Sequence, residues 1–190
     1  GLTLPLNLEM AATEEMQAIA LRHRPHAVCL VPERRAERTT EGGLDAAADE
    51  NRLAGFIAPL TEAGCRVSLF VGADERQLES AVRIGARVVE LHTGAYCDAA
   101  VEGDAATRDA ELARLREMAA FGTALGLEVH AGHGLTFDTV GPVAAIPELA
   151  ELNIGHFLIG EAIFSGLDSA IRRMRELMER ARREAAGTAA

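Results

Sequence analysis

Two short segments of this chain join histidine to glycine in a way that suits acid–base chemistry. Residues 129–135 read Val-His-Ala-Gly-His-Gly-Leu, and residues 151–156 read Glu-Leu-Asn-Ile-Gly-His. An apolar strand that ends in glycine and histidine presents an imidazole beside bare backbone amides. His133, between two glycines, could therefore transfer a proton near neutral pH. Gly155 and His156 are similar to a cradle of amides that faces a phosphate at a short helix start. The structural alternatives are an exposed turn at His133 and a core histidine at His156.

Two carboxylates on expected strands could complete such a site. Glu9 shares a strand face with Asn7, and Glu90 shares one with His92, because each pair is two residues apart. A carboxylate that points into a barrel is normally paired or catalytic. We favour a catalytic role for Glu9, leave both roles open for Glu90, and expect His92 to hydrogen-bond its own loop.

A metal site is the competing interpretation of the same residue types. Zinc or iron could be held by a set drawn from His92, His130, His133 and His156 together with Glu9 or Glu90. The spacing of His130 and His133 across a turn is not distinctive, so this hypothesis stands behind the acid–base one.

The segment from Pro32 to Gly43 is a long connection for neighbouring units, where two to six residues are usual. It carries three arginines and two threonines, and it ends in two glycines before the next helix. A lid over an anionic substrate has this composition. An exposed charged loop has it too, and the sequence leaves both open.

Apolar strands alternate with helices along the whole chain. The expected strands are 6–10, 27–31, 67–71, 88–92, 127–130 and 152–154. The expected helices are one capped by Thr13 and ended by Pro25, then 45–63, 74–84, 104–125, 139–146 and a long one from 167.

This alternation predicts parallel βαβ units in an α/β fold. A doubly wound sheet is disfavoured because no Gly-x-Gly-x-x-Gly or Walker sequence follows an early strand. We therefore predict a TIM (β/α)8 barrel with six units visible, and expect about 60 residues, or two further units, to precede them. Residues 1–190 are expected to form one domain, with a frayed tail over 185–190.

Composition narrows the class of protein. The formal net charge of −10 argues against nucleic acid as a partner. No run approaches the roughly 20 apolar residues of a membrane span, and no secretory signal opens the chain. The 3 cysteines are widely spaced and form no Cys-x-x-Cys pair, so we expect a cytoplasmic protein without disulfides or a zinc ribbon.

Together these segments are similar to the pyridoxine 5′-phosphate synthase family, barrel enzymes of the deoxyxylulose-phosphate-dependent route to vitamin B6. The match is carried, in the family's order, by residues 6–11, 30–33 with 39–45, 90–94, and 131–135 with 151–156. The resemblance implies condensation of 3-amino-2-oxopropyl phosphate with 1-deoxy-D-xylulose 5-phosphate to pyridoxine 5′-phosphate, phosphate and water. It implies no metal or organic cofactor, small phosphorylated substrates, and a homo-oligomer, an octamer in the family.

The resemblance also implies roles for individual residues. It makes Glu9 a general base, His133 a general acid and Glu90 a group that stabilises a transition state. It implies that Thr39, Gly134, Gly155 and His156 contact the substrate or its phosphate. It also implies that the loop carrying Thr39 is a lid. His130 stands where the family more often has Asn, and Glu161 where it commonly has Arg.

The family's Asn-x-Asp-His and His-Leu-Arg segments, which supply another histidine and phosphate contacts, are not in this sequence. We therefore expect the chain by itself not to be a complete active enzyme. Two alternatives stay open: a phosphosugar isomerase or aldolase on the same barrel, and a phosphate-binding barrel fragment without turnover. An aldolase would need a Schiff-base lysine at a strand end, whereas this chain carries arginine instead.

Overall fold

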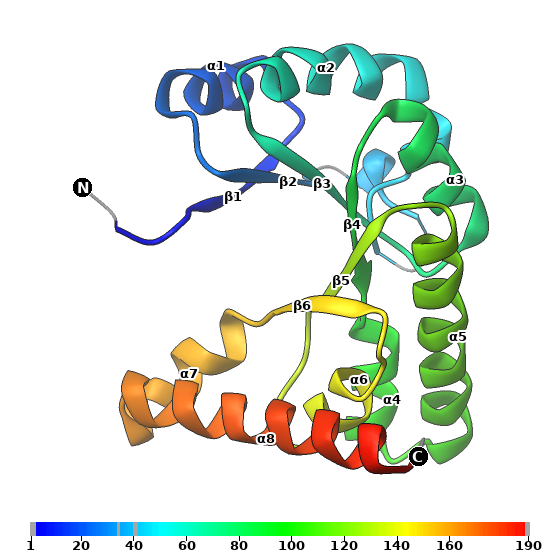
Figure 1. Cartoon of the computed structure of the whole chain (residues 1–190), viewed down its shortest axis with the longest axis vertical. Coiled ribbons are helices and arrows are strands. Elements are labelled where there is room, and N and C mark those ends of the chain that lie inside the picture. The colour runs from blue at the N-terminus through cyan, green and yellow to red at the C-terminus, as the bar shows by residue number, and fades with distance from the viewer. Residues whose placement is uncertain (1–2, 34, 40–41, 189–190) are drawn as a thin grey trace. The chain divides into compact units, whose positions relative to one another are not determined.

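The computed structural model describes residues 3–33, 35–39 and 42–188. Six strands alternate with helices, and their order in the sheet is their order in the chain, from β1 to β6 (Figure 1). The chain divides into two compact units: Gly1–His92 with Phe121–Val129, and Thr93–Ala120 with His130–Ala190. The prediction of one domain over 1–190 stays a prediction.

The first unit contains four parallel strands. Its elements are β1 (Asn7–Ala11), α1 (Glu14–His23), β2 (Ala27–Val31), the 3₁₀ turns η1 (Arg35–Glu37) and η2 (Ala46–Ala48), α2 (Glu50–Glu62), β3 (Arg66–Val71), α3 (Glu75–Ile84) and β4 (Val88–His92). Leu30 and Leu69 are register partners on one sheet face, and both are fully buried, as is Leu53 of α2. Burial of each such side chain stabilises the fold by about 1.5–3 kcal/mol. Alternate positions along these strands point to the opposite face, which carries the polar residues described below.

The second unit contains the helices that follow β4, apart from the end of α5. Its elements are α4 (Gly94–Glu102), α5 (Ala105–Ala124), β5 (Glu128–Gly132), α6 (Val140–Ala144), β6 (Leu149–Asn153), α7 (His156–Ser165) and α8 (Leu167–Thr188), with the end of α5 and the start of β5 belonging to the first unit. Leu135, Ile146 and Met174 are among its buried side chains. Arg182 of α8 donates hydrogen bonds to the carbonyls of Pro147 and Leu149, which fixes α8 beside β6.

Several predicted boundaries are confirmed. The strands 27–31 and 88–92 are β2 and β4. Thr13 caps α1, where its hydroxyl accepts a hydrogen bond from the Met16 amide at 3.3 Å. Gly85 ends α3 in the left-handed conformation, with φ 91°. Within the part of the chain that is described, no helix is both long enough and apolar enough to span a bilayer.

Other boundaries were wrong. The helix predicted over 45–63 is the short turn η2 followed by α2, because the Asp45 side chain caps Ala48 and Asp49 leaves the helical conformation at φ −141°. Helix α4 was not among the predicted helices, and α7 was anticipated only as a short helix start at Gly155 and His156. Neither begins with a side-chain cap hydrogen bond. Thr93 stands at the N-cap position of α4, but its hydroxyl bonds the carbonyls of Gly132 and His133, and Gly155 at the start of α7 has no side chain that could cap the helix. The expected frayed tail is helical through Thr188, and residues 189–190 lie outside the described residues.

Candidate active site

One face of the first unit's sheet carries a row of polar side chains. Glu9 is the register partner of Cys29, and Cys29 is the partner of Ser68. Ser68 is in turn the partner of Val88, so Glu90, two residues further along β4, lies on the same face. The alternation expected for Glu9 and Glu90 therefore places both carboxylates on a shared face of one sheet.

The two carboxylates occupy different environments. Glu90 is buried, with 7% of its surface exposed, and its Oε2 accepts a hydrogen bond from the Cys29 thiol at 3.6 Å. Burial, and then the charge of Glu90, raise the pKa of the Cys29 thiol well above its ordinary value, so the thiol stays protonated and can donate. Glu9 is exposed. Carboxylates in contrasting surroundings can take different roles in one reaction.

The strand predicted over 6–10, which would place Glu9 next to its C-terminal end, lies one residue further along the chain. β1 extends to Ala11, which pairs with Val31, so Glu9 is the middle residue of its strand. Cys29 is a site residue that the sequence did not single out. Its only sequence signal is its place in the strand before Pro32, and its contact with Glu90 depends on the register of β2 against β4 across β3.

The loop 32–43 folds into a small hairpin in its described part. Arg38 and Leu44 form an antiparallel bridge, and the Thr39 amide donates to the Gly43 carbonyl at 2.9 Å. The Leu44 amide donates to the Phe70 carbonyl at 2.7 Å, which ties the hairpin to β3 near its C-terminal end. Thr39 is half-buried in this hairpin. Arg34, Thr40 and Glu41 lie outside the described residues.

The hairpin also lies beside the end of β4. The ring of His92 packs against Phe70, with centroids 5.2 Å apart and planes tilted by 60°. A Cβ added to Gly42 would lie 3.3 Å from His92 Nε2. Thr39, Phe70 and His92 are thus gathered at the C-terminal ends of β3 and β4, the end at which barrel enzymes build their sites.

The hairpin packs closely against the backbone at the end of β3, so a substitution at Gly43 tests how much this packing stabilises the fold. A Cβ at Gly43 would lie 2.5 Å from the Gly72 amide nitrogen and 2.6 Å from the Val71 carbonyl carbon, so backbone must move. We expect Gly43→Ala to lower the free energy of unfolding by about 1–3 kcal/mol. Gly55 is exposed within α2 with nothing within 4 Å of an added Cβ, so Gly55→Ala should raise that free energy by about 0.5–1 kcal/mol. Urea unfolding of both variants measures the difference, and equal midpoints would contradict the packing argument.

In the second unit, β5 ends in a strained turn that presents His133. His133 has φ 81° and Gly134 has φ 83°, two successive left-handed residues. For a residue other than glycine this conformation costs on the order of 1–3 kcal/mol, and it is found preferentially at functional sites. The His133 side chain is exposed. Gly134 could not be replaced without strain, since its added Cβ would also lie 3.1 Å from Cys97 Cβ.

Thr93 holds this turn in place. It is 1% exposed, and its hydroxyl lies 2.8 Å from the Gly132 carbonyl oxygen and 2.5 Å from that of His133. Its amide also donates to the Gly132 carbonyl at 2.9 Å. Thr93 was not predicted as a site residue, although it lies in the motif 90–94, because its partners are about forty residues further along the chain.

The second histidine–glycine segment forms the start of α7. Gly155 is the N-cap and His156 the first helical residue, and both are exposed, so His156 is not a core histidine. The first amides of a helix have no carbonyl partner within it, and the helix dipole favours an anion there. The start of α7 therefore has the groups that a phosphate needs.

An aromatic pair joins the two loops of the second unit. Phe137, in the loop that begins with His133, meets Phe157 of α7 edge to face with centroids 4.8 Å apart. The Arg173 guanidinium lies 4.1 Å from the centre of the Phe137 ring. The loop that carries His133 is thus fixed against the helix start that carries His156.

His130, a further predicted metal ligand, is paired with a carboxylate of the second unit. His130 is 1% exposed and its Nδ1 lies 3.7 Å from Glu151 Oε1, a contact within the second unit. In the ranges that the structure describes, no three histidine, cysteine, aspartate or glutamate side chains are placed to hold a metal ion.

Residues 1–180 match the protein family described as Pyridoxal phosphate biosynthesis protein PdxJ. The chain belongs to this family. It is 74% identical over 182 residues to the pyridoxine 5′-phosphate synthase of Ruegeria pomeroyi and 72% identical over 181 residues to that of Roseobacter denitrificans. These matches cover 96% and 95% of this chain and 73% of each relative.

Solved structures resemble the chain in fold. An HpcH/HpaI aldolase/citrate lyase family protein from Burkholderia cenocepacia aligns with a TM-score of 0.56 at 15% identity, over 93% of this chain and 77% of that one. The 3-keto-L-gulonate-6-phosphate decarboxylase of Vibrio cholerae aligns with a TM-score of 0.52 at 17% identity, over 92% and 85%. At these identities the likeness concerns the fold alone. With the six alternating strands and helices, it confirms the predicted α/β barrel class.

Proposed function

We propose that the protein carrying this chain is a pyridoxine 5′-phosphate synthase. It condenses 3-amino-2-oxopropyl phosphate with 1-deoxy-D-xylulose 5-phosphate and releases pyridoxine 5′-phosphate, phosphate and water. The observation that carries this proposal is the family match over residues 1–180, together with relatives of that name at 66–74% identity.

Glu9 and Glu90 supply the carboxylates of the reaction. Ring formation between the two substrates requires removal of protons from carbon and loss of water, which are steps of general acid–base catalysis. Glu9, exposed on β1, accepts the proton. Glu90, buried and hydrogen-bonded by Cys29, presents a fixed negative charge that stabilises positive charge in the transition state.

His133 and the start of α7 supply the acid and the phosphate contacts. The His133 imidazole, exposed on its held turn, donates a proton to the departing oxygen. The amides at Gly155 and His156 bind a substrate phosphate, and Gly134 allows close approach of a substrate to the backbone. Thr39 contributes a further substrate contact from its hairpin, which acts as a lid.

The cellular location and the oligomeric state of the enzyme are part of the same proposal. We place it in the cytoplasm as a homo-oligomer, an octamer as in the family that it resembles. The net charge of −10 fits a protein whose anionic substrates are held by local amide donors rather than by long-range attraction.

Product analysis tests the proposal. The whole protein is incubated with both phosphorylated substrates, and pyridoxine 5′-phosphate and inorganic phosphate are quantified by mass spectrometry and a phosphate assay. We expect both products to form together and only when both substrates are present. Conversion of 1-deoxy-D-xylulose 5-phosphate alone would favour an isomerase or aldolase, and binding of both substrates without turnover would favour a non-catalytic barrel.

A further inference from the structure

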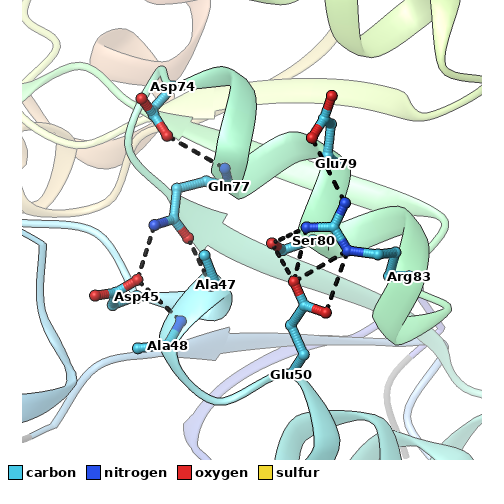
Figure 2. A network of polar contacts seen from close by, with 9 residues as sticks. All are labelled: Asp45, Ala47, Ala48, Glu50, Asp74, Gln77, Glu79, Ser80 and Arg83. Atoms are coloured by element: carbon cyan, nitrogen blue, oxygen red, sulfur yellow. Dashed lines mark hydrogen bonds and ion pairs between the residues drawn. The ribbon is translucent and has the colours of Figure 1, made fainter.

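Gln77 is a buried amide that connects α3 to the end of the loop 32–43. It is 5% exposed, and both ends of its side chain are used. Its Nε2 donates to Asp45 Oδ1 at 2.9 Å, and its Oε1 accepts from the Ala47 amide at 3.2 Å, as Figure 2 shows. The backbone amide of Gln77 donates to Asp74 Oδ1 at 3.3 Å, which caps the start of α3. A buried polar group that loses its partners costs free energy, so this arrangement favours a single position for Asp45.

Asp45 connects Gln77 to the hairpin through hydrogen bonds of its own backbone and side chain. Its amide donates to the Glu37 carbonyl at 2.8 Å, and its Oδ1 also accepts from the Ala48 amide at 3.3 Å. Asp45 directly follows Leu44, which bridges to Arg38, and the Thr39 amide is bonded to Gly43 inside that bridge. The path from Gln77 to Thr39 thus consists of hydrogen bonds and one tight hairpin.

We propose that Gln77 is a positioning residue for the reaction, which holds Thr39 at the C-terminal end of β3 through Asp45. It does not touch the substrate. The inference rests on the proposed function, in which Thr39 contacts a phosphorylated substrate. The alternative is that Gln77 only packs α3 against η2.

A second polar contact on the same helices provides the control. Arg83 of α3 pairs with Glu50 of α2 at 2.7 Å, Ser80 donates to Glu50 at 2.6 Å, and Arg83 also lies 3.5 Å from Glu79 (Figure 2). Hydrogen bonds from Arg83 and Ser80 lower the pKa of the Glu50 carboxyl to about 2. This cluster joins α2 to α3, and among the described residues none of its hydrogen bonds or ion pairs reaches the hairpin. We therefore expect Arg83→Gln to weaken helix packing without changing the position of Thr39.

Limited proteolysis tests the anchoring directly. Trypsin cleaves after the arginines of the loop, Arg35 and Arg38 among them, and the rate reports how often the loop opens. Gln77→Glu sets a carboxylate against the Asp45 carboxylate, and we expect cleavage in the loop to accelerate about tenfold or more. In the double variant Gln77→Glu with Asp45→Asn, the side-chain amide at position 45 can donate to the carboxylate at position 77, which reverses the wild-type hydrogen bond. We expect this double variant to be cleaved at the wild-type rate.

Kinetics of the whole enzyme connect the anchor to the substrate. We expect Gln77→Glu to raise KM for at least one substrate about tenfold, with a smaller change in kcat, and the double variant to reverse it. Arg83→Gln should leave both cleavage and KM at wild-type values. If Gln77→Glu is too unstable to purify, Asp45→Ala breaks the same link from the loop side and should accelerate cleavage in the same way.

The cleavage rates and the KM values each test one step of the proposal. Unchanged cleavage in Gln77→Glu and Asp45→Ala, or equal acceleration in Arg83→Gln, would overturn the anchoring. Faster cleavage with an unchanged KM would overturn the link between Thr39 and substrate. If the wild-type protein makes no pyridoxine 5′-phosphate while cleavage behaves as expected, the proposed function fails and the anchoring of the hairpin by Gln77 stands.

Discussion

Replacing Glu9 by glutamine should lower kcat for pyridoxine 5′-phosphate formation by about 10²–10⁴-fold, the usual contribution of a general base. Glutamine has nearly the same shape as glutamate but cannot accept a proton from carbon. Glu9 is exposed on β1, so the change removes no buried contact and the free energy of unfolding should stay near that of the wild type. Steady-state kinetics and urea unfolding of the whole protein measure the two quantities.

Glu14→Gln is the matched control for this experiment. Glu14 is an exposed glutamate in the first turn of α1, five residues from Glu9, and takes no part in the proposed site. Its replacement should leave kcat unchanged and, through the helix dipole, alter stability by at most about 1 kcal/mol. A Glu9→Gln enzyme within a few-fold of the wild-type rate would assign the base to another residue, Glu90 first.

The sequence predicted the elements that carry the site because their signals are local. Short runs of mostly apolar residues located β2 and β4, and the two-residue spacing set Glu90 and His92 on one face. The glycines on both sides of His133 predicted a turn there, which the φ values of His133 and Gly134 confirm. The catalytic and substrate-binding roles of these residues stay predictions.

The contacts that support those residues could not be predicted, because they join distant parts of the chain. Cys29 meets Glu90 across one intervening strand, and Thr93 meets the carbonyls of Gly132 and His133. Gln77 meets Asp45 because α3 packs against η2, a turn that was predicted to be part of one long helix over 45–63. Supporting contacts of this kind depend on strand register and helix packing, which no local pattern specifies.

His133→Asn should abolish most of the activity while leaving the fold as stable as the wild type. Asparagine adopts the left-handed conformation that position 133 requires, with φ 81°, more readily than most residues. It cannot act as a general acid near neutral pH, so kcat should fall by about 10²–10⁴-fold. His133→Ala should lose as much activity and in addition about 1 kcal/mol of unfolding free energy, since alanine is strained at positive φ.

The comparison of these two variants separates chemistry from backbone geometry at one position. Strain in the turn is borne by the backbone and by the Thr93 hydrogen bonds, which neither replacement removes. Equal loss of kcat in a stable His133→Asn enzyme and a weakened His133→Ala enzyme would therefore locate the lost function in the imidazole. Retention of activity in His133→Asn would show instead that position 133 serves to shape the turn, and that another group delivers the proton.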